Sequence, residues 1–249
     1  MKKLILILFT SLLCSEHLDI QYIGNASFVL SDGKKNIFID FPYEVDAYGF
    51  AMDYSLDSII TGDNNISIIT HHHGDHWWRK GFMASNNKLF APYFVRLFVP
   101  KSREILFEEH SVIDDLIINP IKTPHSFTIE PFGIPISGKC ISHYSYILFW
   151  HNKKIFISGD ANSEYELLQR EKNIDIAIIT YWNGEYAFMN NKNIDANNII
   201  LCHFFNLEQI PQYRESIDKE KLKINALFGE NTNIHVLDQY EHLYINIDE

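Results

Sequence analysis

Short runs of β-branched and aromatic residues, separated by turn-forming glycine, aspartate and asparagine, dominate the chain. Residues 18–23 alternate between apolar and polar, which is typical of a strand with one buried face, whereas 66–69 and 175–180 are mostly apolar without alternation and predict strands covered on both faces. The predicted strands are residues 18–23, 26–30, 36–40, 66–69, 88–91, 104–107, 115–118, 121–124, 144–150, 155–158, 175–180, 197–202, 233–237 and 242–245.

Helices are expected in fewer places. A helix can open at Trp77, and residues 93–99 and 165–170 predict two more short ones. Residues 211–227 predict an amphipathic helix with a proline in its first turn and Gly229 just beyond its end, and residues 56–60 could form a turn of helix. Strands in hairpins, with helices late in each half, indicate a mixed α/β domain.

Composition bounds the class of protein. The chain has 249 residues, of which 46% are hydrophobic and 21% charged, and it contains no Pro/Gly/Ser-rich linker. One domain spanning residues 16–249 is therefore expected. The formal net charge of −11 argues against a nucleic-acid partner, because it repels polyanions.

The first residues form a separate pattern. Lys2 and Lys3 precede an apolar segment, residues 4–14, and Ser15 follows it. This order predicts a signal peptide over residues 1–15, with a buried N-terminal strand as the alternative. The segment is too short for a permanent membrane-spanning helix. The mature protein is exported if the signal is real and is cytoplasmic otherwise.

The densest chemistry lies directly after the apolar run 66–69, in the loop that contains His71, His73, Asp75 and His76. Imidazole and carboxylate groups are ligands that zinc and similar ions accept. Alternate side chains of an extended segment share a face, so His71 and His73 can reach one ion while His72 points away. After the turn at residue 74, the aspartate and the last histidine can reach a second ion.

The spacing His71-x-His73-x-Asp75-His76 resembles the His-x-His-x-Asp-His motif of the metallo-β-lactamase superfamily. In that family the remaining ligands follow later strands, in the order histidine, aspartate after a glycine, and histidine. The chain shows the same order, and the resemblance assigns these three ligands to His125, Asp160 and His203. It implies an α/β fold over residues 16–249, a single-domain four-layer αβ/βα sandwich with metals at the sheet edges.

Two positions leave an alternative open. His143 competes with His125 for the third histidine, but His125 stands directly after the predicted strand 121–124, which favours it. The opening hairpins also resemble the family, with Asn25 where histidine is common and Pro42 one residue late. The resemblance makes Asp40 a partner that orients a ligand histidine, and the alternative is an aspartate that caps a turn.

The resemblance also implies a dinuclear hydrolase. It assigns His71, His73 and His125 to one divalent ion and Asp75, His76 and His203 to a second, with Asp160 shared. Zinc is expected, with manganese or iron as alternatives. A metal-bridging hydroxide would attack an ester, lactone or phosphodiester of a small molecule or lipid, with Asp75 and Asp160 as the catalytic carboxylates.

Motif order and spacing look most similar to the branch that contains ascorbate-6-phosphate lactonase and N-acyl-phosphatidylethanolamine phospholipase D. His143 and Tyr181 are candidates for the proton donor to the leaving group. A β-lactam hydrolase is disfavoured because Asn206 and Leu207, rather than lysine or serine, stand near His203. A non-catalytic metal-binding module of the same fold is a further alternative, and a di-iron oxygen-reducing centre would usually require an additional redox domain. The oligomeric state cannot be derived from the sequence.

Overall fold

The computed structural model describes residues 17–45, 47, 65–126, 141–163, 166–204 and 233–247. The predicted signal peptide over residues 1–15, the predicted helices at 56–60 and 211–227, and residues 206 and 207 lie outside these ranges. Among the described residues, no helix is both long and apolar enough to cross a membrane.

The described residues form two mixed β-sheets. In spatial order, the first sheet contains β13 (His242–Asn246), β1 (His17–Gly24), β2 (Ser27–Ser31), β3 (Asn36–Ile39), β4 (Ile66–Ile68) and β5 (Lys88–Phe90). The second contains β12 (Asn233–His235), β11 (Ala196–Cys202), β10 (Ile174–Thr180), β9 (Lys153–Ile157), β8 (Tyr144–Trp150), β7 (Leu116–Lys122) and β6 (Ser111–Ile113).

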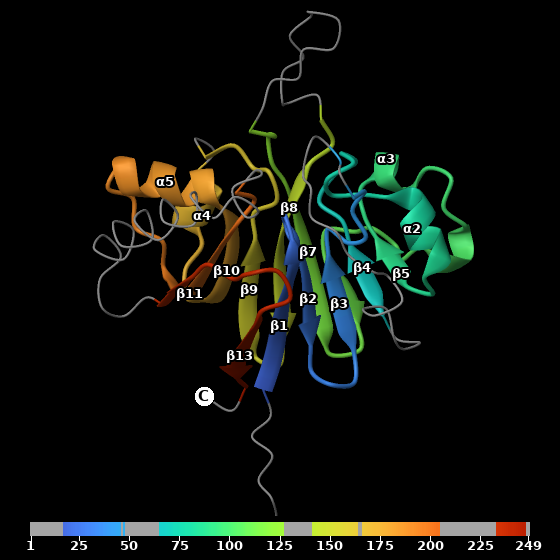
Figure 1. Cartoon of the computed structure of the whole chain (residues 1–249), viewed down its shortest axis with the longest axis horizontal. Helices are drawn as coiled ribbons and strands as arrows, with labels where there is room; N and C mark the ends of the chain where they lie inside the picture. Colours follow the sequence, from blue (N-terminus) through green and yellow to red (C-terminus); the bar gives the residue numbers. More distant parts are fainter. Residues whose placement is uncertain are drawn as a thin grey trace, which may run out of the picture.

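Helices cover the two outer faces, so the molecule has four layers (Figure 1). On one flank lie α2 (Arg79–Ala84) and α3 (Tyr93–Arg96), followed by a 3₁₀ turn (Lys101–Arg103). On the opposite flank lie α4 (Leu167–Arg170) and α5 (Tyr181–Met189), and residues of these helices pack with β10 and β11 in one apolar cluster. The predicted αβ/βα sandwich is confirmed.

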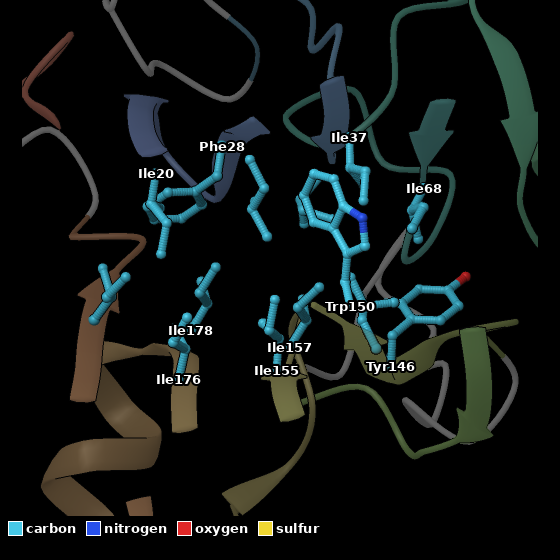
Figure 2. Packing of buried hydrophobic residues seen from close by; sticks show 14 of the residues in the cluster. Ile20, Phe28, Ile37, Ile68, Tyr146, Trp150, Ile155, Ile157, Ile176 and Ile178 are labelled. Carbon is cyan, nitrogen blue, oxygen red and sulfur yellow. The ribbon is translucent and has the colours of Figure 1, made fainter. Parts of the chain in front are cut away.

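A central apolar core lies between the sheets (Figure 2). Ile20, Phe28 and Ile37 of the first sheet share this cluster with Ile176 and Ile178 of the second. Each large side chain removed from water here contributes about 1.5–3 kcal/mol before the entropy of ordering it is counted. This burial holds the two sheets face to face.

Strand β10 shows why residues 176–179 are apolar without alternation. Ile176 and Ile178 point into the core between the sheets, whereas Ala177 and Ile179 belong to the outer cluster beneath α4 and α5. Parallel strands flank β10 on both sides. Both faces are therefore covered, and alternation between apolar and polar residues disappears.

Two expectations about elements are corrected. Residues 104–107 form no strand; Glu104 makes only an isolated bridge to Leu89, and its carboxylate pairs with Arg96 and Lys101. No helix was predicted between the strands 175–180 and 197–202, but the segment after β10 contains α5. Short β6 was not predicted.

The topology brings the end of β4 in the first sheet and the ends of β7, β9 and β11 in the second sheet to the same side of the molecule. Strand β7 is antiparallel to β8, and β8 is antiparallel to β9, so β7 and β9 run in the same direction, as do β10 and β11. The loops after β4, β7, β9 and β11 carry all the predicted ligands.

Candidate metal centre

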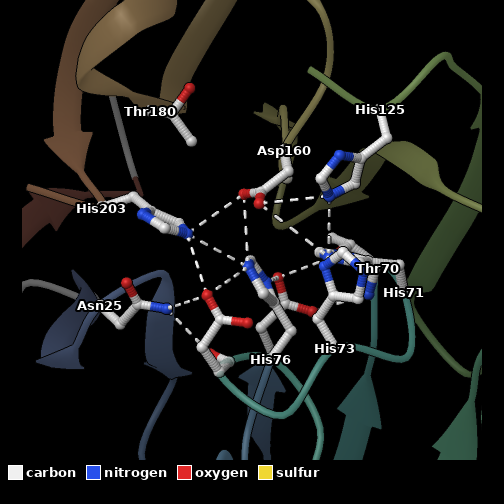
Figure 3. A network of polar contacts seen from close by, with 12 residues as sticks. Asn25, Thr70, His71, His73, His76, His125, Asp160, Thr180 and His203 are labelled. Atoms are coloured by element: carbon white, nitrogen blue, oxygen red, sulfur yellow. Dashed lines mark hydrogen bonds and ion pairs between the residues drawn. The ribbon is translucent and has the colours of Figure 1, made fainter. Parts of the chain in front are cut away.

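The seven predicted ligands lie together between the sheet edges (Figure 3). Six of their side chains are buried and His73 is half-buried. His72 is exposed, as expected for a residue whose side chain points away from the site. The groups with metal-ligand geometry in this region are His71, His73 and His125; His71, His76 and Asp160; and Asp75, His76 and His203.

One trio of histidines gathers at the ends of β4 and β7. The Nε2 atom of His71 lies 3.0 Å from Nδ1 of His73 and 3.2 Å from Nε2 of His125. His143, the alternative to His125, lies outside this group. The position of His125 is fixed by a bridge to Ala161 in the loop after β9.

A second trio combines Asp75, His76 and His203. The Oδ2 atom of Asp75 lies 3.6 Å from Nε2 of His76 and 3.3 Å from Nε2 of His203, and the two histidine nitrogens lie 3.3 Å apart. Four ligand atoms held about 2.05 Å from a zinc ion in a tetrahedron are about 3.3 Å from one another. The separations in both trios fit a tetrahedral ion of this size.

Asp160 lies between the trios. Its Oδ1 atom is 3.3 Å from Nε2 of His76 and 3.4 Å from Nε2 of His203. Its Oδ2 atom faces the other trio, 3.5 Å from Nε2 of His125 and 4.0 Å from Nε2 of His71. One carboxylate therefore presents one oxygen to each trio, which is the arrangement of a bridging ligand.

Asp40 supports histidines of both trios. Its Oδ2 atom lies 2.8 Å from Nδ1 of His76 and also accepts a hydrogen bond from the Thr70 hydroxyl. That hydroxyl lies 3.0 Å from Nδ1 of His71. With protons on the two Nδ1 atoms, both Nε2 lone pairs are available for metals. The contact predicted for Asp40 is confirmed, and Thr70 is a link that sequence reasoning missed.

Asn25 performs a similar task for the second trio. Its side-chain amide donates to the backbone oxygen of Asp75 at 2.9 Å and approaches Oδ2 of the same residue at 3.4 Å. Its backbone oxygen accepts a hydrogen bond from the N–H of His203. This asparagine stands where the family often has histidine, and it joins two residues of one trio.

The electrostatics favour cations at the second trio. Burial would lower the pKa of His76, but the carboxylates of Asp160, Asp75 and Asp40 outweigh burial and raise it well above its ordinary value. The same balance, dominated by Asp160, raises the pKa of His203 to about 9. The negative charge of the carboxylates, which raises these two pKa values, would also attract a divalent ion. Such an ion neutralises the carboxylates more fully than protons on the imidazoles do.

The first trio lies in a different field. Burial lowers the pKa of His71 well below its ordinary value, and the neighbouring His76 adds to this effect. Burial and nearby His125 lower the pKa of His73 to about 4. Both side chains are therefore neutral at physiological pH, the form in which imidazole binds a metal.

The ring of His143 lies next to the rings of His71 and His125, but His143 belongs to none of the candidate metal-binding groups among the described residues. It is fully buried, its Nδ1 atom is 2.8 Å from the Thr123 hydroxyl, and burial lowers its pKa to about 3. A Cβ atom added to Gly159 would lie 2.7 Å from its Nε2 atom and 2.8 Å from Cβ of Thr70. The packing leaves room only for glycine before Asp160.

The aromatic residues near the ligands belong mostly to packed layers. Trp77 contacts Phe82 in the cluster beneath α2, and Phe204 is buried in the cluster beneath α5. The Trp182 ring meets the His203 ring edge-on, with centroids 4.9 Å apart. Trp182 therefore forms a wall beside the second trio.

Comparisons with known proteins complete the description. No protein-family model matches the sequence, and no curated protein is significantly similar to it. Solved structures that are similar over nearly the whole chain include the following three. Igni18, a metallo hydrolase from Ignicoccus hospitalis, is 14% identical with a TM-score of 0.62, and the alignment covers 92% of this chain and 98% of that one. YhfI from Bacillus subtilis, described as a metallo-β-lactamase fold protein, is 12% identical with a TM-score of 0.60, covering 92% and 99%. An isothiocyanate hydrolase from Delia radicum gut bacteria is 16% identical with a TM-score of 0.59, covering 90% and 98%.

Proposed function

We propose that this chain, which has the metallo-β-lactamase fold, is a hydrolase that uses two divalent metal ions to cleave an ester, lactone or phosphodiester in a small molecule or lipid. The observation that carries the proposal is the position of Asp160, whose two carboxylate oxygens face the two trios separately. A site for a single ion would not need this arrangement.

The metals would supply Lewis acidity, which lowers the pKa of water towards ~7 and stabilises developing negative charge. The protein's own residues prepare the place for this chemistry. Asp160 and Asp75 provide negative charge in a buried setting, and Asp40 fixes the orientation of His71 and His76. The burial of the ligands excludes bulk water and strengthens these interactions.

Fewer observations support the proposed class of substrate than support the proposed metal centre. One solved neighbour is an isothiocyanate hydrolase, so the fold alone does not choose the bond that is cleaved. The resemblance to the branch of ascorbate-6-phosphate lactonase and N-acyl-phosphatidylethanolamine phospholipase D stays a prediction. Zinc, with manganese or iron as alternatives, suits the donor set of imidazole and carboxylate.

The test compares wild type with Asp160→Asn, a substitution that keeps the volume and removes the charge. Metal content is measured by mass spectrometry, and turnover is measured with bis-p-nitrophenyl phosphate, a panel of lactones and a chromogenic β-lactam. Glu109→Gln is the matched control, because it removes one exposed carboxylate outside the site. We expect about two ions per chain in wild type and in the control, with reduced metal content and at least a hundredfold slower turnover in Asp160→Asn.

The substrate panel separates the alternatives. Turnover of the phosphodiester or of a lactone identifies the bond class, and turnover of the β-lactam alone would make the protein a β-lactam hydrolase. A protein that binds two metals and hydrolyses none of these compounds would support a non-catalytic module. A metal-free protein, or activity unaffected in Asp160→Asn, would contradict the proposed site.

A further inference from the structure

The charge of the chain is distributed unevenly along its sequence. Residues 76–103 contain six of the 21 lysines and arginines and none of the 32 aspartates and glutamates. This segment comprises α2, β5, α3 and the 3₁₀ turn, which together form one flank of the molecule (Figure 1). A strongly basic segment thus belongs to a protein whose formal net charge is −11.

Two of these basic residues are exposed at the start of α2. Arg79 and Lys80 make no ion pair among the residues that the structure describes, whereas Arg96 and Lys101 share Glu104. The guanidinium of Arg79 donates two hydrogen bonds to the backbone oxygen of Phe98, at 2.7 and 3.0 Å. A carbonyl group positions the guanidinium without cancelling its charge.

Three aromatic side chains project from the same flank. Tyr93 is 62% exposed, Phe94 54% and Phe98 80%. The rings of Tyr93 and Phe94 contact each other edge-on, with centroids 5.6 Å apart, and Phe98 has a left-handed backbone at φ 67°. A single exposed aromatic residue is ordinary, but three within six positions beside two unpaired cations form an amphipathic surface.

This surface, which we call the α2–α3 face, consists of Arg79, Lys80, Tyr93, Phe94 and Phe98. It adjoins the loop that carries the ligands, because the Phe94 ring lies 6.0 Å, centroid to centroid, from the ring of His72. The Arg79 guanidinium lies 6.0 Å from the Phe98 ring. Cationic and aromatic groups are therefore interleaved.

We propose that the α2–α3 face docks the protein on an anionic lipid surface. Arg79 and Lys80 would bind headgroup phosphates, while the rings of Tyr93, Phe94 and Phe98 enter the interface between headgroups and acyl chains. Stable docking of a soluble domain needs electrostatic attraction together with apolar insertion, and this face offers both.

The composition of the face favours lipid over nucleic acid. A nucleic-acid strand requires a series of basic groups along its backbone, with rings on which successive bases stack. The face has two exposed, unpaired cations at one place, and its most exposed ring is at a turn. A planar anionic interface requires contact with this one flank only, so the acidic remainder of the protein can stay away from it.

Docking would also hold the metal-binding loop next to the lipid surface, a consequence that rests on the proposed function. The docking itself does not depend on catalysis, so binding can be measured separately from turnover. A failure of vesicle binding would leave the hydrolase proposal intact, and a failure of hydrolysis would leave the docking proposal intact.

The experiment measures sedimentation of the full-length protein with sucrose-loaded vesicles of pure phosphatidylcholine and of phosphatidylcholine containing phosphatidylglycerol. Four proteins are compared: wild type, Arg79→Gln/Lys80→Gln, Phe94→Ser/Phe98→Ser, and the control Lys34→Gln/Met189→Ser. The control removes one exposed cation and one exposed apolar side chain from other parts of the molecule. The apolar residues 4–14 are present in all four proteins, so comparison between variants removes their contribution.

We expect wild type and the control to prefer phosphatidylglycerol vesicles, with binding that weakens as salt is added. The Arg79→Gln/Lys80→Gln variant should lose about thirtyfold in its partition onto these vesicles. The Phe94→Ser/Phe98→Ser variant should lose at least about tenfold in the same partition. Its residual binding should still weaken as salt is added. Circular dichroism and the melting temperature check that all four proteins are folded.

Three outcomes would overturn the proposal. The first is equal binding of wild type to both kinds of vesicle, and the second is equal loss in the control and in the face variants. The third is displacement of wild type from the vesicles by an oligothymidylate, with tight binding of that strand lost in the Arg79→Gln/Lys80→Gln variant, which would identify nucleic acid as the partner.

Discussion

Asp40 connects the two trios of the candidate metal centre through a single carboxylate. It contacts His76 directly and His71 through the hydroxyl of Thr70. Asp40→Asn keeps the size of the side chain but places an amide where a carboxylate accepts three hydrogen bonds, from the Thr70 N–H, the Thr70 hydroxyl and Nδ1 of His76. We expect a 10–100-fold loss of metal affinity, because the substitution of a residue that orients a ligand histidine typically costs this much. Competition with a chromogenic chelator measures the affinity.

A second Asp–His pair provides the control for this substitution. Asp19 lies 2.8 Å from Nδ1 of His242 at the surface, in strands β1 and β13. Asp19→Asn should leave metal affinity unchanged. Equal affinity in Asp40→Asn and wild type would show that the orientation of the histidines does not depend on this carboxylate.

A comparison of alanine substitutions at Gly159 and Gly33 distinguishes the cost of backbone strain from the cost of steric conflict. Both have left-handed backbones, at φ +50° and +80°. An added Cβ atom would meet nothing within 4 Å at Gly33, whereas at Gly159 it would lie 2.7 Å from His143 and 2.8 Å from Thr70. Gly33→Ala should lower the free energy of unfolding by about 1 kcal/mol, and Gly159→Ala by about 3 kcal/mol or more.

Urea unfolding followed by circular dichroism measures this difference. The metal content of Gly159→Ala should also fall, because Asp160 follows directly and Thr70 precedes His71. Equal destabilisation by the two substitutions would mean that the residues around Gly159 move aside at little cost.

The gathering of the seven candidate ligands could be predicted because each one follows a predicted strand. His125 stands directly after β7, whereas His143 precedes β8, and the structure places only the former with His71 and His73. The supporting residues were harder to predict, because Asp40 meets its partners only in the folded chain. Asp40 has a left-handed backbone where β3 ends, and both oxygens of its carboxylate bond to Thr70 or His76, which favours the orienting role over the capping of a turn.

At the scale of elements, strands were predicted more successfully than helices. The alternating or continuous apolar pattern of a strand records which of its faces are buried, as β1 and β10 show. Helix α5 gives a weaker signal, because Gly184 lies inside it and the aromatic residues Tyr181, Trp182 and Tyr186 are modest helix formers. Packing against β10 and β11 stabilises α5, and that packing depends on tertiary structure.

Three turns at the end opposite to the metal centre form an inter-sheet clamp. Lys35, after β2, donates to Asp115 at 2.7 Å and lies 3.3 Å from Asp114, both between β6 and β7. Asp32 meets His151, between β8 and β9, at 2.9 Å. Burial would lower the pKa of Lys35, but the two carboxylates outweigh it and raise the pKa.

Lys35→Met should lower the free energy of unfolding by about 1 kcal/mol near pH 7, since it removes the pairs and keeps the side-chain stem. Burial would raise the pKa of Asp115, but Lys35 and hydrogen bonds hold it below its ordinary value. The stabilisation is therefore present above pH ~4 and is lost as the pH falls through the lowered pKa of the carboxyl group. It is also lost at alkaline pH, above the raised pKa of Lys35.

Urea unfolding of Lys35→Met and wild type at a series of pH values measures this dependence. Lys34→Met is the control, because Lys34 is exposed and makes no ion pair among the described residues. A difference between Lys35→Met and wild type that grows on acidification would contradict the electrostatic origin of the clamp.

At the scale of the whole molecule, metal binding should couple the two sheets. The ligands come from the end of β4 in the first sheet and from the ends of β7, β9 and β11 in the second. At a free metal concentration 100 times the dissociation constant, one occupied site adds about 2.7 kcal/mol to stability. For a chain of this size we expect the melting temperature to rise by about 5–10 °C on adding zinc to chelator-treated protein.

Differential scanning calorimetry with and without metal measures this shift. Asp160→Asn should show a smaller shift, and Glu109→Gln should behave as wild type. An unchanged melting temperature in wild type would contradict a metal site built from both sheets.

The pairing of β1 with β13 has a consequence for how the protein is made. The N-terminal strand of the first sheet joins the last described strand, through partners from His17 with Asn246 to Gln21 with His242. During translation, β1 leaves the ribosome early and keeps one unpaired edge until the C-terminal strand arrives, on the order of tens of seconds later. Unpaired strand edges recruit other chains. The nascent protein is therefore open to association with other chains at this edge of β1 until β13 pairs with it.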